Sequence, residues 1–163
     1  KESLGCFMTD VMRETTKSDL AFQNPGGVRL SKLPAGKITA KDIYKMDPFD
    51  NIIIKYKVSG QEIMDMLEMA CYKTEDFPMF CSGCTCILHR NEYEEIESIE
   101  IVLDNGKPLD LKAKYNIAIN SYMASVYNFV EHKGKEFQHS NEMLFQYLEK
   151  RKHINYADVT RIR

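Results

Sequence analysis

The chain has 163 residues, of which 44% are hydrophobic and 28% are charged, which is enough apolar material for one domain with a real core. Its net charge of −2 excludes the broad basic field with which proteins gather nucleic acid or acidic membranes, so no nucleic-acid partner is expected. No apolar run approaches the roughly 20 residues that a membrane-spanning helix needs, so no membrane span is expected either.

The first part of the chain predicts a helix, a strand and a second, short helix. Apolar residues at helical spacing predict an amphipathic helix over residues 4–17. Residues 19–23 have the pattern of a short strand that runs into a Pro-Gly-Gly turn. Thr39, followed three residues later by Asp42, is expected to cap the short helix.

The middle of the chain predicts an interior strand followed by a capped helix. Residues 51–58 include three consecutive isoleucines, so this strand is apolar on both faces at its start and is expected inside a sheet. Ser59 and Glu62 form a Ser-x-x-Glu capping box, which predicts a helix over 60–73.

The rest of the chain predicts more strands than helices, with a hairpin-type turn at 104–106. The expected elements are strands over 79–89, 96–103, 115–120 and 159–162 and a helix over 140–152. Strands and helices mix without strict βαβ alternation. The expected fold is therefore α+β, a single domain over 1–163 with a mixed sheet flanked by helices.

A glycine turn is the first candidate for ligand binding. Residues 24–29 read Asn-Pro-Gly-Gly-Val-Arg. Gly26 and Gly27 let backbone N–H groups approach an anion closely, because no Cβ stands in the way. Arg29 supplies a planar fork that suits phosphate or carboxylate. The alternative is an ordinary tight turn in which Arg29 pairs with a surface carboxylate.

Two aromatic residues far apart in the sequence are the second candidate. Phe49 follows a proline and lies between two aspartates, and Tyr122 follows the end of a predicted strand, so both are expected in loops. Two rings from separate loops can clamp a flat heterocycle, and each stacked base contributes about 1–3 kcal/mol. The alternative is that both rings lie in the core. Together with the glycine turn, the rings indicate a pocket for a nucleoside or nucleotide.

Five cysteines are an odd number, so they cannot all pair within one chain. The run of Cys81, Cys84 and Cys86 leaves three interpretations open. It could supply three thiolates to zinc with His89 as a fourth ligand, form a disulfide or redox pair such as Cys81–Cys84, or be a buried strand in which cysteine is a small hydrophobic residue. Strand alternation places Cys84 and Cys86 on one face and His89 on the other.

Catalytic machinery is not expected in this chain. It has four histidines, none in an Asp-x-His or Gly-Asn-His-Asp context, so no two-metal hydrolytic site can be drawn. It also lacks a P-loop, a G-x-G-x-x-G fingerprint and a G-x-S-x-G elbow. We therefore expect no catalytic residue, no metal ligand and no cofactor here.

Five short motifs follow one another in a definite order. They are residues 4–12 (LGCFMTDVM), 24–29 (NPGGVR), 34–39 (PAGKIT), 48–49 (PF) and 105–110 (NGKPLD). In this order the chain resembles the C-terminal, substrate-binding domain of the 5′-nucleotidase / UDP-sugar hydrolase family. The similarity runs from about residue 4 to about residue 130, and more loosely to the end.

The resemblance assigns roles to particular residues. It implies that Asn24 and Arg29 contact a nucleotide and that Phe49 and Tyr122 hold the base between their rings. The substrate-binding residues expected on this basis are Asn24, Gly26, Gly27, Arg29, Phe49, Tyr122 and Asn128.

The chain departs from the family pattern twice. Pro25 stands where the family usually has a third glycine, which deletes one backbone donor. Residues 126–129 read Val-Tyr-Asn-Phe where the family usually has Gly-Gly-Asp-Gly, whose aspartate binds ribose hydroxyls. Asn128 can make two hydrogen bonds to a diol but is neutral. Either the pocket is reshaped for another ligand, or ligand binding has been lost.

The resemblance implies a nucleoside- or nucleotide-binding specificity domain of a 5′-nucleotidase-type phosphohydrolase, acting in nucleotide catabolism. The hydrolysis is expected of a metallophosphatase domain that is absent from this chain, holds two divalent metals, and is joined in cis or as a separate chain. Family members are typically periplasmic, secreted or on the cell surface. The alternatives are a non-catalytic interaction module with a degenerate ligand site and, on the cysteine run, a small zinc or redox protein.

Overall fold

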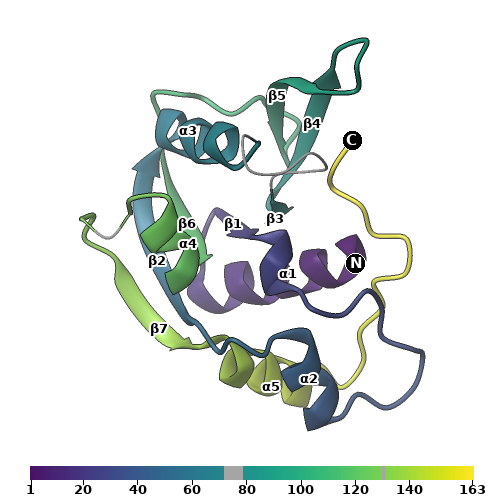
Figure 1. Cartoon of the computed structure of the whole chain (residues 1–163). Coiled ribbons are helices and arrows are strands. Elements are labelled where there is room, and N and C mark those ends of the chain that lie inside the picture. The colour runs from purple at the N-terminus through teal and green to yellow at the C-terminus, as the bar shows by residue number, and fades with distance from the viewer. Residues whose placement is uncertain (72–78, 130) are drawn as a thin grey trace.

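The computed structural model describes residues 1–71, 79–129 and 131–163. In this part of the chain, a mixed five-stranded sheet and a separate two-stranded sheet are packed with helices (Figure 1). The elements are α1 (Glu2–Thr16), β1 (Leu20–Gln23), the 3₁₀ turn η1 (Pro25–Gly27), α2 (Ala40–Met46), β2 (Ile52–Ser59), α3 (Gly60–Cys71), β3 (Phe80–Ser82), β4 (Cys84–Arg90), β5 (Ile96–Leu103), β6 (Lys114–Asn120), α4 (Ser121–Val126), β7 (Lys135–His139) and α5 (Ser140–Arg151). The expected α+β fold with a mixed sheet flanked by helices is confirmed.

The five-stranded sheet has the order β3-β1-β6-β2-β7, with β1 parallel to β6 and the other neighbours antiparallel. Strand β2 has a partner on each side, as its isoleucines predicted. Ile53 pairs with Asn120, which brings the start of β2 beside the end of β6. Because β1 runs parallel to β6, its end lies at the same edge of the sheet.

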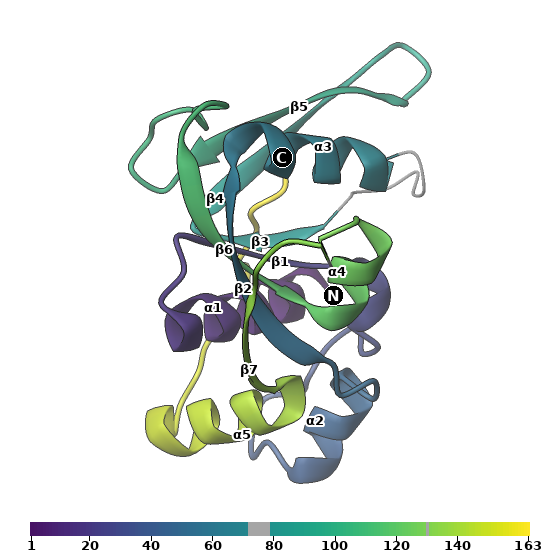
Figure 2. The same ribbon diagram turned by 90° about the vertical axis from the view of Figure 1, so that its left-hand side faces the viewer.

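The two faces of this sheet cover two separate cores, and strand alternation sorts the residues between them. Leu20, Phe22, Ile117 and Ile119 face a core that includes α3 and α4. The intervening residues of the same strands face a core that includes α1, α2 and α5. Figure 2 shows the β4–β5 sheet at one end of the molecule and α2 and α5 at the other.

Both predicted capping boxes are present. The Thr39 side chain accepts from the Asp42 N–H, and the Asp42 carboxylate accepts from the Thr39 N–H at 2.8 Å. The Glu62 carboxylate accepts from the Ser59 N–H at 2.7 Å, and the Ser59 hydroxyl accepts from the Glu62 N–H at 3.2 Å. The predicted helix over 60–73 therefore starts as expected; its last two residues lie outside the described ranges. Among the described residues, no helix is both long and apolar enough to cross a bilayer.

The strand predicted over 79–89 is in fact two strands that belong to different sheets. Gly83 separates β3 from β4 and has a φ of 86°, a conformation that other residues rarely adopt. A Cβ at this position would lie 2.3 Å from the Asp19 carbonyl oxygen. The glycine therefore both permits the bend and leaves room for the neighbouring backbone.

Three further differences between prediction and structure concern segments whose sequence carries only a weak secondary-structure signal. The strand predicted over 159–162 is only an isolated bridge between Ile162 and Cys86. Helix α4 and strand β7 were not predicted. Strand β7 pairs with β2, and its sequence KEFQH carries little strand propensity, so its conformation depends on the β2 edge that it covers.

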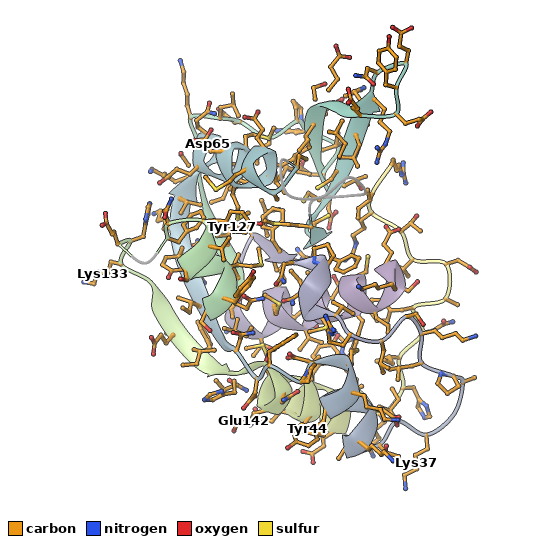
Figure 3. The ribbon with its side chains drawn as sticks, viewed as in Figure 1. Lys37, Tyr44, Asp65, Tyr127, Lys133 and Glu142 are labelled. Carbon is orange, nitrogen blue, oxygen red and sulfur yellow. The ribbon has the colours of Figure 1, made fainter. Side chains whose placement is uncertain are left out.

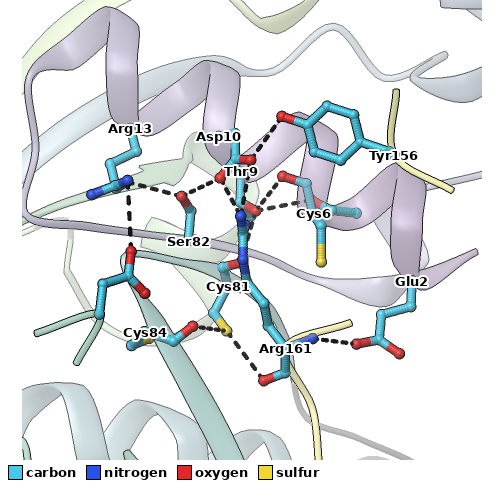
Figure 4. A network of polar contacts seen from close by, with 12 residues as sticks. Glu2, Cys6, Thr9, Asp10, Arg13, Cys81, Ser82, Cys84, Tyr156 and Arg161 are labelled. Atoms are coloured by element: carbon cyan, nitrogen blue, oxygen red, sulfur yellow. Dashed lines mark hydrogen bonds and ion pairs between the residues drawn. The ribbon is translucent and has the colours of Figure 1, made fainter. Parts of the chain in front are cut away.

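The segment after α5 passes over α1 and is held there by polar contacts (Figure 4). Asp10 on α1 accepts from the Tyr156 hydroxyl at 2.7 Å and from the Arg161 guanidinium at 2.7 and 3.0 Å. Glu2 accepts from the backbone N–H groups of residues 161 and 162 at 2.7 and 3.1 Å. These contacts fix the end of the chain beside β4.

Candidate functional site

Two loops and the start of a helix meet at one edge of the five-stranded sheet. The loop after β1 contains the glycine turn, and the loop before β2 contains Phe49. Helix α4 begins directly after β6, and Tyr122 is its second residue. The pairing of β2 and β1 with β6 places these three segments side by side. The glycine turn and both aromatic residues therefore share this edge.

Side-chain amides join the loop after β1 to the start of α4. The Asn120 amide nitrogen donates to Gln23 Oε1 at 3.1 Å and to Asn24 Oδ1 at 3.0 Å. The Asn120 Oδ1 accepts from the Met123 N–H at 2.8 Å and so caps α4. Sequence reasoning selected Asn24 but missed Gln23 and Asn120, which are almost fully buried. The available signal was an amide residue at the last position of each strand.

The glycine turn is a single 3₁₀ turn with Pro25 at its first position, where the missing N–H costs little. The Gly27 N–H donates to the Asn24 carbonyl at 3.0 Å, so this donor is already used inside the turn. A Cβ on Gly27 would lie 2.1 Å from Gln23 Nε2. In this structure a side chain at Gly27 would displace the Gln23 amide, whereas Gly26 is exposed.

Arg29 and Phe49 lie together. The Arg29 N–H donates to the Met46 carbonyl at 2.8 Å, which ties the end of the glycine turn to the end of α2. The exposed guanidinium carbon then lies 5.8 Å from the centre of the Phe49 ring. A cation and a ring that face the same space could contact the phosphate and the base of one ligand.

A buried carboxylate, that of Asp47, holds the Phe49 loop through hydrogen bonds. Asp47 accepts hydrogen bonds from the Ser140 hydroxyl and from the backbone N–H groups of Phe49 and Asp50. Burial raises the pKa of Asp47 above its ordinary value, although these hydrogen bonds partly offset the effect. The loop is therefore held from inside, while Phe49 itself is 55% exposed.

Tyr122 is also 55% exposed, but it lies in the first turn of α4 and not in a loop as predicted, because Asn120 caps this helix directly at the end of β6. The start of α4 is bonded directly to the Phe49 loop. The Ser121 hydroxyl accepts from the Ile52 N–H and donates to Asn51 Oδ1, both at 3.2 Å. The alternative that both aromatics lie in the core is therefore wrong. That a base is held between the two rings stays a prediction.

Asn128 has a local structural role. It has a φ of 60° just after α4, and the Phe129 N–H donates to the Ala124 carbonyl at 2.8 Å, the bond that closes a Schellman motif. Phe129 is buried against Tyr56, with ring centres 5.6 Å apart. Figure 3 shows Tyr127 close to α4. The bulk of this segment thus packs beneath α4, and an additional ligand role for Asn128 stays a prediction.

The cysteine run lies in the core. Cys81, Cys84 and Cys86 are fully buried and all five cysteines are free thiols, which agrees with the small-hydrophobe interpretation and not with the disulfide. The zinc interpretation stays a prediction. The His89 side chain is 53% exposed and lies 3.5 Å from the Glu100 carboxylate, on the other face of β4 as alternation predicted. His89 therefore does not lie where it could bind a metal ion together with these three sulfurs.

The four charged residues that Figure 3 labels do not lie together. Figure 3 shows Lys37, Asp65, Lys133 and Glu142 at widely separated points of the periphery, and all four are exposed. This arrangement agrees with the small net charge. Any recognition of a phosphate must therefore be local, at a group such as Arg29.

Comparisons with known proteins identify the family. The model for the C-terminal domain of 5′-nucleotidase matches residues 1–131. A 5′-nucleotidase of Vibrio parahaemolyticus is 33% identical over 123 residues, which cover 76% of this chain and 21% of that protein. An NAD 5′-nucleotidase of Haemophilus influenzae is 30% identical over 146 residues, covering 80% of this chain and 24% of that protein.

The likeness of the folds extends further along the chain than the family model does. The crystal structure of a 5′-nucleotidase precursor from Thermus thermophilus matches with a TM-score of 0.81 at 25% identity, over 99% of this chain and 35% of that one. This chain belongs to the 5′-nucleotidase C-terminal domain family. It spans about a fifth of the length of the Vibrio relative. The resemblance carried by the five motifs is confirmed.

Proposed function

We propose that this chain is the nucleoside- or nucleotide-binding specificity domain of a 5′-nucleotidase-type phosphohydrolase. The observation that carries the proposal is that the glycine turn, the Phe49 loop and the start of α4 lie at one sheet edge, with Arg29 beside Phe49 and the rings of Phe49 and Tyr122 both half exposed. The rings would hold the base, and Arg29 would neutralise a phosphate. Asn24, Gly26, Gly27 and Asn128 complete the proposed site.

The domain would contribute to catalysis by positioning its ligand. A metallophosphatase domain, in cis or as a separate chain, would supply two divalent metals that activate water and stabilise the transferred phosphoryl group. Holding the ester in the correct geometry beside those metals lowers the barrier by removing the cost of bringing the reactants together. As the family resemblance implies, the domain would act in the periplasm, in the extracellular space or on the cell surface. Its role there would be in nucleotide catabolism.

Calorimetric titration of this chain with a panel of nucleosides, nucleotides and UDP-sugars tests the proposal. We expect micromolar to millimolar binding of at least one panel member. Phe49→Ala and Tyr122→Ala should each weaken that binding by about 1–3 kcal/mol, because each removes one stacking surface. The double variant should abolish measurable binding.

Tyr93→Ala is the matched control. Tyr93 is 75% exposed in the turn between β4 and β5, which lies at the opposite end of the molecule from α2. Its removal also truncates an exposed ring but should leave the affinity unchanged. Equal losses in all three variants, or no binding of any panel member by the unaltered chain, would refute the proposal.

The packing of residues 126–129 favours a second candidate, a non-catalytic interaction module with a degenerate ligand site. Where the family usually has three glycines, this chain has bulky side chains, and Phe129 lies in the core. If the panel gives no binding, the exposed rings would serve a protein partner instead. In that case Phe49→Ala and Tyr122→Ala should weaken association with the metallophosphatase domain, measured by analytical ultracentrifugation of the two purified parts.

A further inference from the structure

Three thiols that the proposed nucleotide site does not use lie together in the core. The sulfur atoms of Cys81, Cys84 and Cys86 are all within 4.8 Å of one another. The Cys81 and Cys86 sulfurs are 3.7 Å apart, and the Cys81 thiol lies 3.3 Å from the Cys84 carbonyl oxygen. All three residues are fully buried, so the cluster is shielded from water.

The backbone brings the three sulfurs to one point. Cys84 and Cys86 are two residues apart on β4, so their side chains leave the same face of the strand. Cys81 comes from β3, which pairs with β1 in the other sheet. The bend at Gly83 turns the chain between them, so Cys81 meets the β4 pair from the side. The arrangement thus depends on the junction between the two sheets.

The spacing of the sulfurs suits one soft metal ion. Three thiolates bound to a single ion at about 2.3 Å in a plane have sulfurs about 4 Å apart. The observed sulfur–sulfur distances, 3.7 Å for Cys81 and Cys86 and no more than 4.8 Å for the other pairs, reach this geometry with small shifts. Within residues 1–71, 79–129 and 131–163, the group of close potential ligands contains these three cysteines and no histidine or carboxylate. Zinc prefers four ligands, whereas soft thiolates select Cu(I), for which three sulfurs suffice.

We propose that Cys81, Cys84 and Cys86 form a binding site for one soft monovalent metal ion of the Cu(I) class. The ion enters as Cu(I) and keeps its oxidation state. Each thiol that becomes a thiolate ligand releases one proton to the solvent, so binding tightens as the pH rises. The positive charge of the ion offsets part of the thiolate charge that burial would otherwise disfavour.

The end of the chain covers this site. The Cys86 N–H donates to the Arg161 carbonyl at 2.8 Å, and the Arg163 N–H donates to the Cys86 carbonyl at 2.9 Å. The Arg161 carbonyl oxygen also lies 3.9 Å from the Cys81 sulfur. Residues 161–163 therefore lie against Cys81 and Cys86, and we expect the buried site to take up the ion slowly compared with a surface thiol.

The test uses the whole chain, reduced and freed of reductant, with all five thiols confirmed by titration. Cu(I) is supplied anaerobically with ascorbate and a chromogenic chelator that competes for it. We expect one Cu(I) per chain, an ultraviolet thiolate-to-copper absorption band and a raised midpoint of thermal unfolding, because the ion binds the folded state. Zn(II) should bind more weakly than Cu(I).

Single variants locate the site. Cys84→Ala and Cys86→Ala should each lower the Cu(I) affinity by more than about 100-fold. Losing a residue that merely supports a metal ligand costs up to about 100-fold, and these variants lose a ligand itself. Cys71→Ala is the matched control, because Cys71 is a half-buried thiol outside the cluster. It should bind Cu(I) as the unaltered chain does.

Several results would overturn the proposal. They are a failure of the unaltered chain to bind Cu(I), tighter binding of Zn(II) than of Cu(I), or equal affinities in Cys71→Ala and Cys84→Ala. If Cys84→Ala or Cys86→Ala does not fold, X-ray absorption of the unaltered Cu(I)-loaded chain decides the question. Three sulfur neighbours are expected, and nitrogen or oxygen neighbours would contradict the assignment.

Discussion

Asp10 is a mostly buried carboxylate in the middle of α1. Ser82 donates to it at 2.5 Å, Tyr156 at 2.7 Å, and Arg161 from its two terminal guanidinium nitrogens. Burial opposes the charge on Asp10, but its hydrogen bonds and the adjacent guanidinium outweigh burial and lower its pKa below the ordinary 3.8. Such a group stabilises the fold above that pH and loses its contribution as the pH falls further.

Asp10→Asn should lower the free energy of unfolding at pH 7 by about 3 kcal/mol. The amide leaves the partly buried Arg161 guanidinium without its counter-charge, and breaking a buried ion pair costs this much. Urea denaturation at several pH values measures the effect. As the pH falls through the lowered pKa of Asp10 the two proteins should converge, because the carboxyl group of the unaltered chain then becomes protonated.

Glu14→Gln provides the control for this variant. Glu14 and Arg151 form an ion pair of the same 2.7 Å length, but the two side chains are 44% and 56% exposed. An exposed pair contributes about 0–1 kcal/mol, so this variant should change stability little. Equal losses in Asp10→Asn and Glu14→Gln would show that the buried network is not the cause.

At the scale of elements, the short helix α4 depends on residues at both of its ends. Asn120 caps its start, and the left-handed Asn128 ends it. Asparagine tolerates this conformation better than other residues with a Cβ, although glycine tolerates it best. The segment that differs from the family's glycine-rich pattern therefore keeps an asparagine at its one left-handed position.

Asn128→Gly should leave the free energy of unfolding unchanged or raise it slightly, whereas Asn128→Ala should lower it by about 1 kcal/mol. Thermal and urea unfolding measure both. Because the glycine variant removes the amide without harming the helix end, its nucleotide affinity isolates any ligand role of the side chain. If alanine proves as stable as glycine, the left-handed end is not a constraint.

At the scale of the whole molecule, the segment after α5 connects parts of the fold that are distant in sequence. Arg161 bonds to Asp10, 151 residues away, and its backbone pairs with Cys86. The segment thereby joins α1 to β4 and covers the three buried thiols. Its removal should affect both global stability and the accessibility of the core.

Ending the chain after residue 159 should lower the unfolding midpoint and expose Cys81 and Cys86 to a thiol reagent under native conditions. The truncation removes the Arg161 contacts and the backbone bonds beside Cys86. Labelling followed by mass spectrometry of peptides measures the reactivity of each cysteine. If these cysteines react no faster than in the full chain, the terminal segment does not cover them.

Much of the secondary structure was predictable because its signals are local. The isoleucine run of β2, the Ser59–Glu62 capping box and the periodicity of α1 each act within a few residues. Strand β7 and the break at Gly83 were missed. The first forms only by pairing with β2, and the second depends on the approach of the Asp19 carbonyl oxygen.

The residues of the candidate site also fall into those that local motifs predicted and those that were missed. The glycine turn, Phe49 and Tyr122 were selected from motifs, since each motif is a short contiguous segment. Gln23, Asn120 and Asp47 were missed, although they hold those motifs in place. Their roles depend on partners on another strand or helix, and the amide residues at the ends of β1 and β6 were the local signal for two of them.

Five short motifs in order were sufficient to indicate the family by resemblance, and local patterns predicted most helices and strands and the exposure of both aromatic residues. Three-dimensional packing alone placed those residues at one sheet edge, brought Arg29 to Phe49 and gathered three sulfurs beneath the end of the chain. The physical reason is the distance along the sequence over which each kind of signal acts. Capping, turn and periodicity signals act between neighbours in the chain, whereas strand pairing and burial of two cores select contacts between residues that are distant in sequence.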